Sequence, residues 1–112
     1  MGAMTVIPER SQAEREFDYA MHHTYEAAGK QTGYWAHRFL SLVRRRGGVG
    51  AARKLLADKD VSDGFLKLRK AGRLDLSVEY EVLRPKFHEL FTDAERVIAR
   101  QRLIAYGVKP PS

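Results

Sequence analysis

Apolar residues recur every three or four positions along most of the chain, which is the spacing of amphipathic helices. The first stripe passes through Phe17 and Met21 and stops at Gly29. Ser11 and Glu14 stand ahead of it at the spacing of a capping box, in which each side chain accepts a backbone N–H of the other residue. The pattern predicts an N-terminal helix that begins after Ser11 and ends near Gly29.

A second stripe with helical spacing follows and consists of Trp35, Phe39, Leu42 and Val43. Thr32 is the expected N-cap of this helix, and the pair Gly47 and Gly48 is expected to end it. A third, short helix is predicted over residues 49–57.

Residues that favour helix N-termini divide the second half of the chain in the same way: Ser62, Asp75 or Ser77, and Thr92 with Glu95. Pro85 prevents a smooth continuation of the helix before it, and Gly107 closes the last helix. No segment alternates cleanly between apolar and polar residues, so no strand is expected. The predicted fold class is all-α, a single compact domain of six or seven short helices.

The same stripes predict which side chains are buried. The expected core contains the largest apolar residues of the stripes: Trp35, Phe39, Phe65, Leu66, Leu83, Phe87 and Ile98. The last helix is expected to bury Val97, Ile98, Ile104 and Ala105. Trp35 has an alternative role on the surface, because an exposed tryptophan stacks well on an unpaired base.

Length and composition narrow the class of protein. The 112 residues fit one domain, and 44% hydrophobic with 30% charged residues is an ordinary globular composition. Cysteine is absent, which excludes disulfides and cysteine-based zinc sites. No apolar run approaches the roughly 18 residues of a membrane span, and we expect a cytoplasmic protein without membrane contact. The opening MGAM reads as a cloning scar at residues 1–4, ahead of a single helical domain at residues 5–112.

Positive charge is concentrated in the middle of the chain. Residues 31–73 carry a formal charge of +8, against −2 for residues 1–30 and zero for residues 74–112. A field of this kind attracts polyanions, chiefly nucleic acid. The alternative is a set of ordinary solvated arginines, some of which offset the negative end of a helix dipole.

The candidate nucleic-acid-binding residues are the basic side chains of this middle region: Arg38, Arg44, Arg45, Arg46, Arg53, Lys54, Lys67, Arg69, Lys70 and Arg73. Two of the predicted helices, residues 49–57 and 62–71, invite comparison with a helix-turn-helix motif. Asp63 at the start of the second of these helices has the wrong charge for DNA, so we expect contacts to phosphates more than base reading. Tyr34 or Trp35 would add stacking on an unpaired base.

Signatures of catalysis and of bound cofactors are weak. His22 and His23 are adjacent and point about 100° apart on a helix, which does not suit one metal ion. The GGVG segment at residues 47–50 lacks the preceding strand and the lysine of a phosphate-binding loop. We expect neither an enzyme nor a cofactor.

Short motifs from Gly33 to Gly107 also form a recognisable frame: GYW at 33–35, FL at 39–40, VRRRGG at 43–48, AARKLL at 51–56, VSDGF at 61–65, GRLDLSVE at 72–79, VLRP at 82–85, LFT at 90–92 and RLIAYG at 102–107. This frame resembles an uncharacterised small bacterial helical domain, which is found alone or attached to DNA restriction and other DNA-processing proteins. The resemblance covers residues 33–107, and the N-terminal helix at residues 9–28 lies outside it. It implies an accessory or binding role and no mechanism.

Two functions remain open at this point. One is a nucleic-acid-binding module that uses the basic surface of residues 38–73. The other is a protein-interaction adaptor, or an accessory subunit of a DNA-processing or defence system. In this second case the basic face meets an acidic protein, or the N-terminal helix pairs with a second copy as a homodimer.

Overall fold

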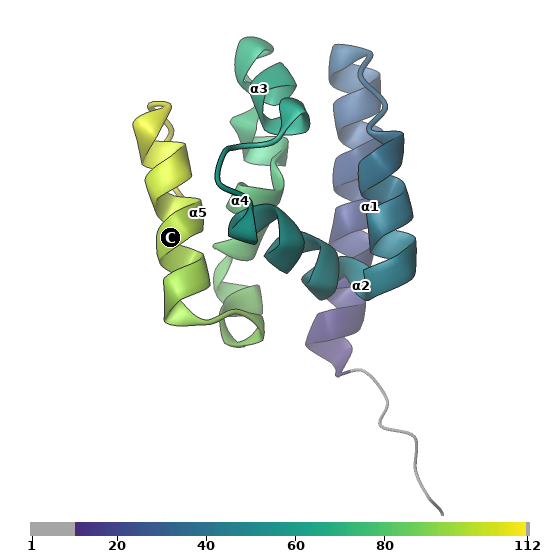
Figure 1. Cartoon of the computed structure of the whole chain (residues 1–112), viewed down its shortest axis with the longest axis vertical. Coiled ribbons are helices and arrows are strands. Elements are labelled where there is room, and N and C mark those ends of the chain that lie inside the picture. The colour runs from purple at the N-terminus through teal and green to yellow at the C-terminus, as the bar shows by residue number, and fades with distance from the viewer. Residues whose placement is uncertain (1–10, 112) are drawn as a thin grey trace, which may run out of the picture.

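The computed structural model describes residues 11–111, and this part of the chain folds into α-helices and 3₁₀ helices without a strand (Figure 1). In chain order the elements are α1 (Gln12–Thr32), α2 (His37–Ala57), α3 (Asp63–Lys70), η1 (Leu74–Leu76), α4 (Val78–Val82), η2 (Pro85–Leu90) and α5 (Asp93–Ala105). The all-α prediction is confirmed. The expected cloning scar at residues 1–4 lies outside the described residues.

The helices α1, α2 and α5 pack around the short central helix α4. In Figure 1, α1 and α5 lie on opposite sides of the molecule, and α4 lies between them and packs against both. The first half of α2 runs along α1, and the second half turns toward α4 and α5. No helix in residues 11–111 is long and apolar enough to cross a bilayer.

The predicted N-caps of four helices are confirmed. The Ser11 hydroxyl accepts the Glu14 N–H at 3.1 Å while the Glu14 carboxylate accepts the Ser11 N–H at 2.9 Å, which completes the capping box of α1. The same reciprocal pair links Thr92 and Glu95 at the start of α5. Single hydroxyl caps stand at the starts of α3 and α4, from Ser62 and Ser77 respectively. These contacts span three residues each, which is why the sequence reveals them.

The end of α1 differs from the prediction. The helix passes through Gly29 and continues to Thr32, and Gly33 closes it with a left-handed φ of 76°. Thr32 therefore does not cap α2: its hydroxyl donates to the Ala28 carbonyl at 2.7 Å and accepts the Tyr34 N–H at 3.0 Å. Trp35 falls in the connection between the helices and is 40% exposed, so its predicted place in the core is wrong.

The two adjacent glycines end the first helical segment of α2, as predicted, and a second segment follows after a kink. Gly47 has φ 75° and ψ 169°, a conformation that is essentially restricted to glycine. Gly48 starts the second half of the helix, and its N–H donates to the Asp18 carboxylate of α1 at 2.5 Å. A Cβ on Gly48 would lie only 3.0 Å from the Asp18 Cα, so the backbones of α1 and α2 touch at this point. The predicted helix at residues 49–57 is the second half of α2.

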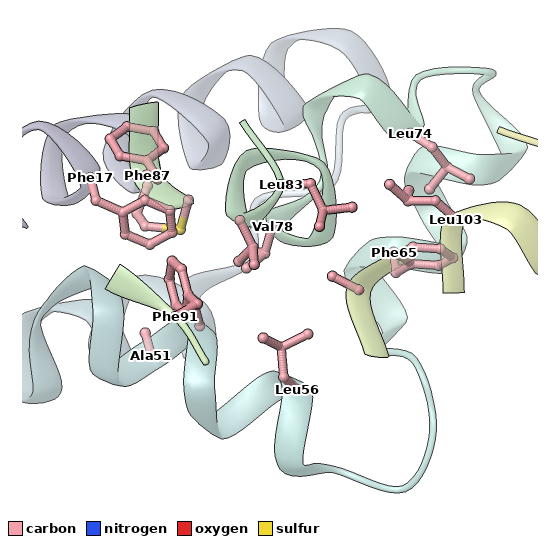
Figure 2. Packing of buried hydrophobic residues seen from close by; sticks show 14 of the residues in the cluster. Phe17, Ala51, Leu56, Phe65, Leu74, Val78, Leu83, Phe87, Phe91 and Leu103 are labelled. Carbon is pink, nitrogen blue, oxygen red and sulfur yellow. The ribbon is translucent and has the colours of Figure 1, made fainter. Parts of the chain in front are cut away.

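Aromatic rings link the helices at both ends of the core (Figure 2). The Phe17 ring of α1 meets Phe87 and Phe91 edge-on, with centroids 4.9 and 5.1 Å apart. At the other end, Phe65 of α3 meets Tyr106 in the same manner at 5.1 Å. Burial of such rings is the main source of stability in a domain of this size. The predicted burial of Phe65, Leu83 and Phe87 is confirmed.

Of the four residues predicted to form the buried face of α5, Ile98 packs against the core partly buried, and Val97, Ile104 and Ala105 are exposed. Val97 and Ile104 are 45% and 57% exposed, and the helix buries Ala99 and Leu103 instead. Leu66 of α3 was also expected in the core and is 41% exposed, because Phe65 and Leu68 face inward on that short helix.

An ion pair explains the rotation of α5. The Arg102 guanidinium donates to the Glu79 carboxylate at 3.1 Å and to the carbonyls of Leu55 and Asp58 at 3.0 and 2.7 Å. Both carbonyls belong to the C-terminal end of α2, which favours a cation. Drawing Arg102 inward turns Val97 and Ile104 to the solvent.

Glu79 is the buried half of this pair, at 2% exposure. Burial raises the pKa of its carboxyl above the usual 4.5, against the smaller effects of its own backbone N–H and of Arg102, which lower it. A carboxyl whose pKa is higher in the folded state stabilises the fold below the pKa of the unfolded chain, and this stabilisation is lost as the pH rises through the folded pKa.

Replacing Gly48 with alanine tests the contact between α1 and α2. The new Cβ meets the Asp18 backbone, so we expect unfolding to become easier by about 1–3 kcal/mol. Gly64→Ala is the matched control, since its Cβ would have no neighbour nearer than 3.7 Å, and it should leave stability unchanged or raise it by up to about 1 kcal/mol. Equal denaturation midpoints for the two variants would contradict the close approach.

Replacing Glu79 with glutamine tests the buried carboxyl. The amide keeps an oxygen that accepts from Arg102 and removes the titration. As the pH rises above about 4.5, we expect the wild type to lose unfolding free energy relative to Glu79→Gln, because only the wild type must ionise a buried group. Urea denaturation of both proteins across mildly acidic to neutral pH measures this. A difference that stays constant or changes in the opposite direction rejects the assignment.

Candidate nucleic-acid interface

The basic face of the molecule begins with α2, which contains no acidic residue over its whole length. Its buried side chains point to the core, namely Val43, Ala51, Ala52 and Leu56. Every basic side chain of the helix is exposed: Arg38, Arg44, Arg45, Arg46, Arg53 and Lys54. The amphipathic pattern of α2 thus places all of its positive charge in solvent.

Four of these arginines have no partner within residues 11–111. Arg38 and the triplet Arg44, Arg45 and Arg46 take part in no ion pair, hydrogen bond or ring contact there. Arg38 and Arg45 are seven positions apart, so they lie on one side of the helix about 10 Å apart along its axis. We call these four residues the free arginine face.

The triplet occupies the last turn before the bend at Gly47. Cations at this position offset the negative end of the helix dipole by about 0.3–1 kcal/mol each. This effect needs one or two charges. It does not explain three of them, and it does not apply to Arg38, which stands in the first turn.

Arg53 and Lys54 are differently placed, because both have carboxylate partners. Arg53 pairs with Glu95 at 3.2 Å and donates to the Leu90 carbonyl at 3.0 Å. Lys54 pairs with Asp58 at 2.9 Å, one turn along the same helix. Arg53 thus links α2 to α5 and to Leu90, Lys54 pairs at the end of its own helix, and part of the charge of both is neutralised.

The predicted basic residues after α2 are also mostly engaged. Lys67 lies over the Tyr34 ring and Arg69 over the Tyr106 ring, at 5.8 and 4.9 Å from the centroids. Arg73 makes two hydrogen bonds to Asp75, at 3.0 and 3.1 Å, and these hold the pKa of the Asp75 carboxyl below its usual range. Lys70 is exposed and has no partner in the described part of the chain.

The ten predicted residues therefore do not form one surface of free cations. Arg38 and Tyr34 line the same cleft, Lys67 lies over the Tyr34 ring, Arg69 lies over Tyr106, and Lys70 is exposed. The triplet lies at the other end of the first half of α2, about 10 Å further along the helix axis. Arg53, Lys54 and Arg73 serve the fold as ion-pair partners.

A cleft of about 430 Å³ opens where α1, the start of α2, α3 and α4 meet. Aromatic side chains make up much of its wall, namely Tyr25, Tyr34, Trp35, Phe39 and Phe65. The ionisable groups of the lining are His37, Arg38, Asp63 and Glu79. Its size is within the usual range for small-molecule sites. The residue pattern gave no sign of this cleft, because its walls come from four separate segments.

Trp35 forms one side of the cleft and is fixed from behind by α1. A Cβ built on Gly29 would lie 2.3 Å from two atoms of the indole ring, so only glycine allows the ring to lie against the helix there. Tyr25 meets the same ring at 5.5 Å with an angle of 61° between the planes, and its hydroxyl is hydrogen-bonded to His37 Nδ1 at 3.2 Å. The indole is thus held on one side and open to solvent on the other.

The start of α2 is also distinctive. Its N-cap is Ala36, which has no side chain that accepts the first backbone N–H groups. Hydroxyl side chains cap the other four α-helices of residues 11–111. The N–H groups of Arg38 and Phe39, two residues of the cleft lining, therefore have no side-chain acceptor.

Residues 11–111 contain no group of three histidine, aspartate or glutamate side chains that could hold a metal ion. His22 and His23 are exposed on α1. No family model, curated protein or solved structure matches the chain, so the resemblance to a small helical domain of DNA-processing proteins stays a prediction.

Proposed function

We propose that this protein is a non-catalytic nucleic-acid-binding module whose free arginine face binds the phosphates of DNA. The observation that carries the proposal is that four exposed arginines form no ion pair within residues 11–111. Arg38, Arg44, Arg45 and Arg46 are exposed without a carboxylate partner, on a helix that has no acidic residue. The basic residues elsewhere in the predicted set mostly have partners inside the protein.

Unpaired arginines favour phosphate binding for two physical reasons. No intramolecular ion pair has to be broken before a phosphate binds, and the planar guanidinium offers two parallel N–H donors to phosphate oxygens. Each phosphate contact releases condensed counterions, which supplies most of the affinity of such interfaces.

The chemistry of α2 favours contacts to the backbone of DNA over reading of bases. The helix has no asparagine or glutamine, the side chains that recognise adenine. In α3, Asp63 stands in the first turn, and Lys67 and Arg69 lie over tyrosine rings. The first turn of α3 thus offers no donor side chain with which a recognition helix reads base edges.

The resemblance to a domain of DNA-processing proteins supports DNA as the ligand, and a cytoplasmic location belongs to the same proposal. An acidic protein is the competing partner. It would meet the same arginines, but it would not show the salt dependence of counterion release from a duplex.

Replacing Arg44, Arg45 and Arg46 together with alanine tests the proposal. The change removes exposed side chains without partners, so stability should shift by less than about 0.5 kcal/mol per residue. We expect duplex DNA of any sequence to bind about tenfold or more weakly at low salt. The log–log dependence of affinity on salt should flatten by up to about three units of slope, as measured by fluorescence anisotropy at several salt concentrations.

The matched control removes the same charge elsewhere. Lys59, Arg100 and Lys109 are exposed and lie outside the predicted set. If their triple replacement with alanine weakens binding as much as the triplet does, only net charge matters and the face is not a site. If the wild type binds no nucleic acid, the proposal is wrong and the adaptor function takes its place.

A further inference from the structure

We propose, resting on the proposed function, that the cleft beside Trp35 binds one unpaired base of a single-stranded nucleic acid. In this arrangement the base stacks on the open face of the indole and the neighbouring phosphate lies at the start of α2. The protein would then prefer single strands, or duplexes with an unpaired base, over a continuous duplex.

The placement of Trp35 is the first argument. A large aromatic ring that is 40% exposed loses hydrophobic stabilisation, yet this ring is positioned by close packing on Gly29 and by an edge contact with Tyr25. Such a fixed ring can stack on a base without losing side-chain freedom, since its rotamer is already set. Stacking on aromatic side chains is the usual way in which proteins hold unpaired bases.

The charges around the cleft give the second argument, because they separate a place for a base from a place for a phosphate. Arg38 and Tyr34 belong to the lining, and the Lys67 ammonium lies 5.8 Å from the centroid of the Tyr34 ring. The lining also contains the exposed Asp63, whereas the Glu79 carboxylate is buried and held by Arg102. The Asp63 carboxylate repels a phosphate inside the cleft but accepts a hydrogen bond from the amino group of a base.

The uncapped start of α2 gives the third argument. The N–H groups of Arg38 and Phe39 lack a side-chain acceptor, and the positive end of the helix dipole adds to the charge of Arg38. A phosphate bound there lies at the entrance to the cleft. Each part of a nucleotide thus has a place in the proposed site. The phosphate lies at the start of α2, the base stacks on Trp35, and the amino group of the base points toward Asp63.

The sole tryptophan of the chain makes the test direct, because its fluorescence reports on this ring alone. The probes are two labelled single strands of about ten units, one of deoxyadenosine and one of abasic sites with the same phosphates. We expect the base-containing strand to quench Trp35 fluorescence and to bind between about fivefold and a hundredfold more tightly than the abasic strand. The abasic strand should still bind through the free arginine face, without quenching.

The outcomes separate the two proposals. If both strands bind equally and neither quenches the tryptophan, the cleft does not hold a base, while phosphate binding stands. If neither strand binds, and neither the deoxyadenosine strand nor free deoxyadenosine quenches the tryptophan, both proposals fail. Quenching by the strand together with the affinity difference supports the cleft.

Variants add a second measurement by anisotropy. Trp35→Ala should bring the affinity ratio of the two strands to about one, and Trp35→Phe should keep part of the preference, because a phenyl ring still stacks. Tyr19→Ala is the matched control, since Tyr19 is an exposed aromatic residue of α1 outside this cleft, and it should keep the full ratio. A Trp35→Ala protein that folds and retains the preference overturns the proposal. If that variant does not fold, the comparison of the two strands on the wild type decides.

Discussion

The hydrogen bond from the Gly48 N–H to the Asp18 carboxylate fixes the point at which α2 bends across α1. Two different properties of glycine meet there: Gly47 adopts a backbone conformation closed to other residues, and Gly48 lets two helix backbones touch. A straight α2 would leave the aromatic core around Phe17 uncovered on one side. The bend sends Ala51, Ala52 and Leu56 into the core and leaves the first half of the helix on the surface.

The same bend decides which cations are available to a ligand. Beyond it, α2 packs against α4 and α5. There Arg53 pairs with Glu95, and Arg102 donates a hydrogen bond to the Leu55 carbonyl near the end of α2. Before it, the helix runs along α1 and borders the cleft, and its outward arginines have no carboxylate partner. Topology therefore accounts for the partner of Arg53, whereas Lys54 pairs locally with Asp58. The four arginines before the bend have no carboxylate partner in residues 11–111.

Much of the fold was predictable because its determinants are local. The capping boxes at Ser11 and Thr92 involve residues three positions apart. The adjacent glycines at positions 47 and 48 predict the break in α2. The failures share another cause. The exposure of Val97 and Ile104 depends on Arg102 reaching Glu79 on another helix, and the exposure of Trp35 depends on α1 running past Gly29 to Gly33. Periodicity within one segment carries no information about such partners.

In the candidate site too, local features could be predicted from the sequence, and contacts between distant segments could not. The concentration of positive charge in residues 31–73 is a property of the sequence, but the pairing of Arg53 with Glu95 joins residues 42 positions apart and appears only in the fold. The extra turn of α1 has the largest consequence for function. It brings Gly29 beneath the indole and leaves Ala36 as the N-cap of α2, so the exposed ring and the uncapped helix start arise together. The exposed indole of Trp35 and the uncapped helix start at Ala36 are then adjacent in the chain and line the same cleft, and this pairing is the basis of the proposed base-binding site.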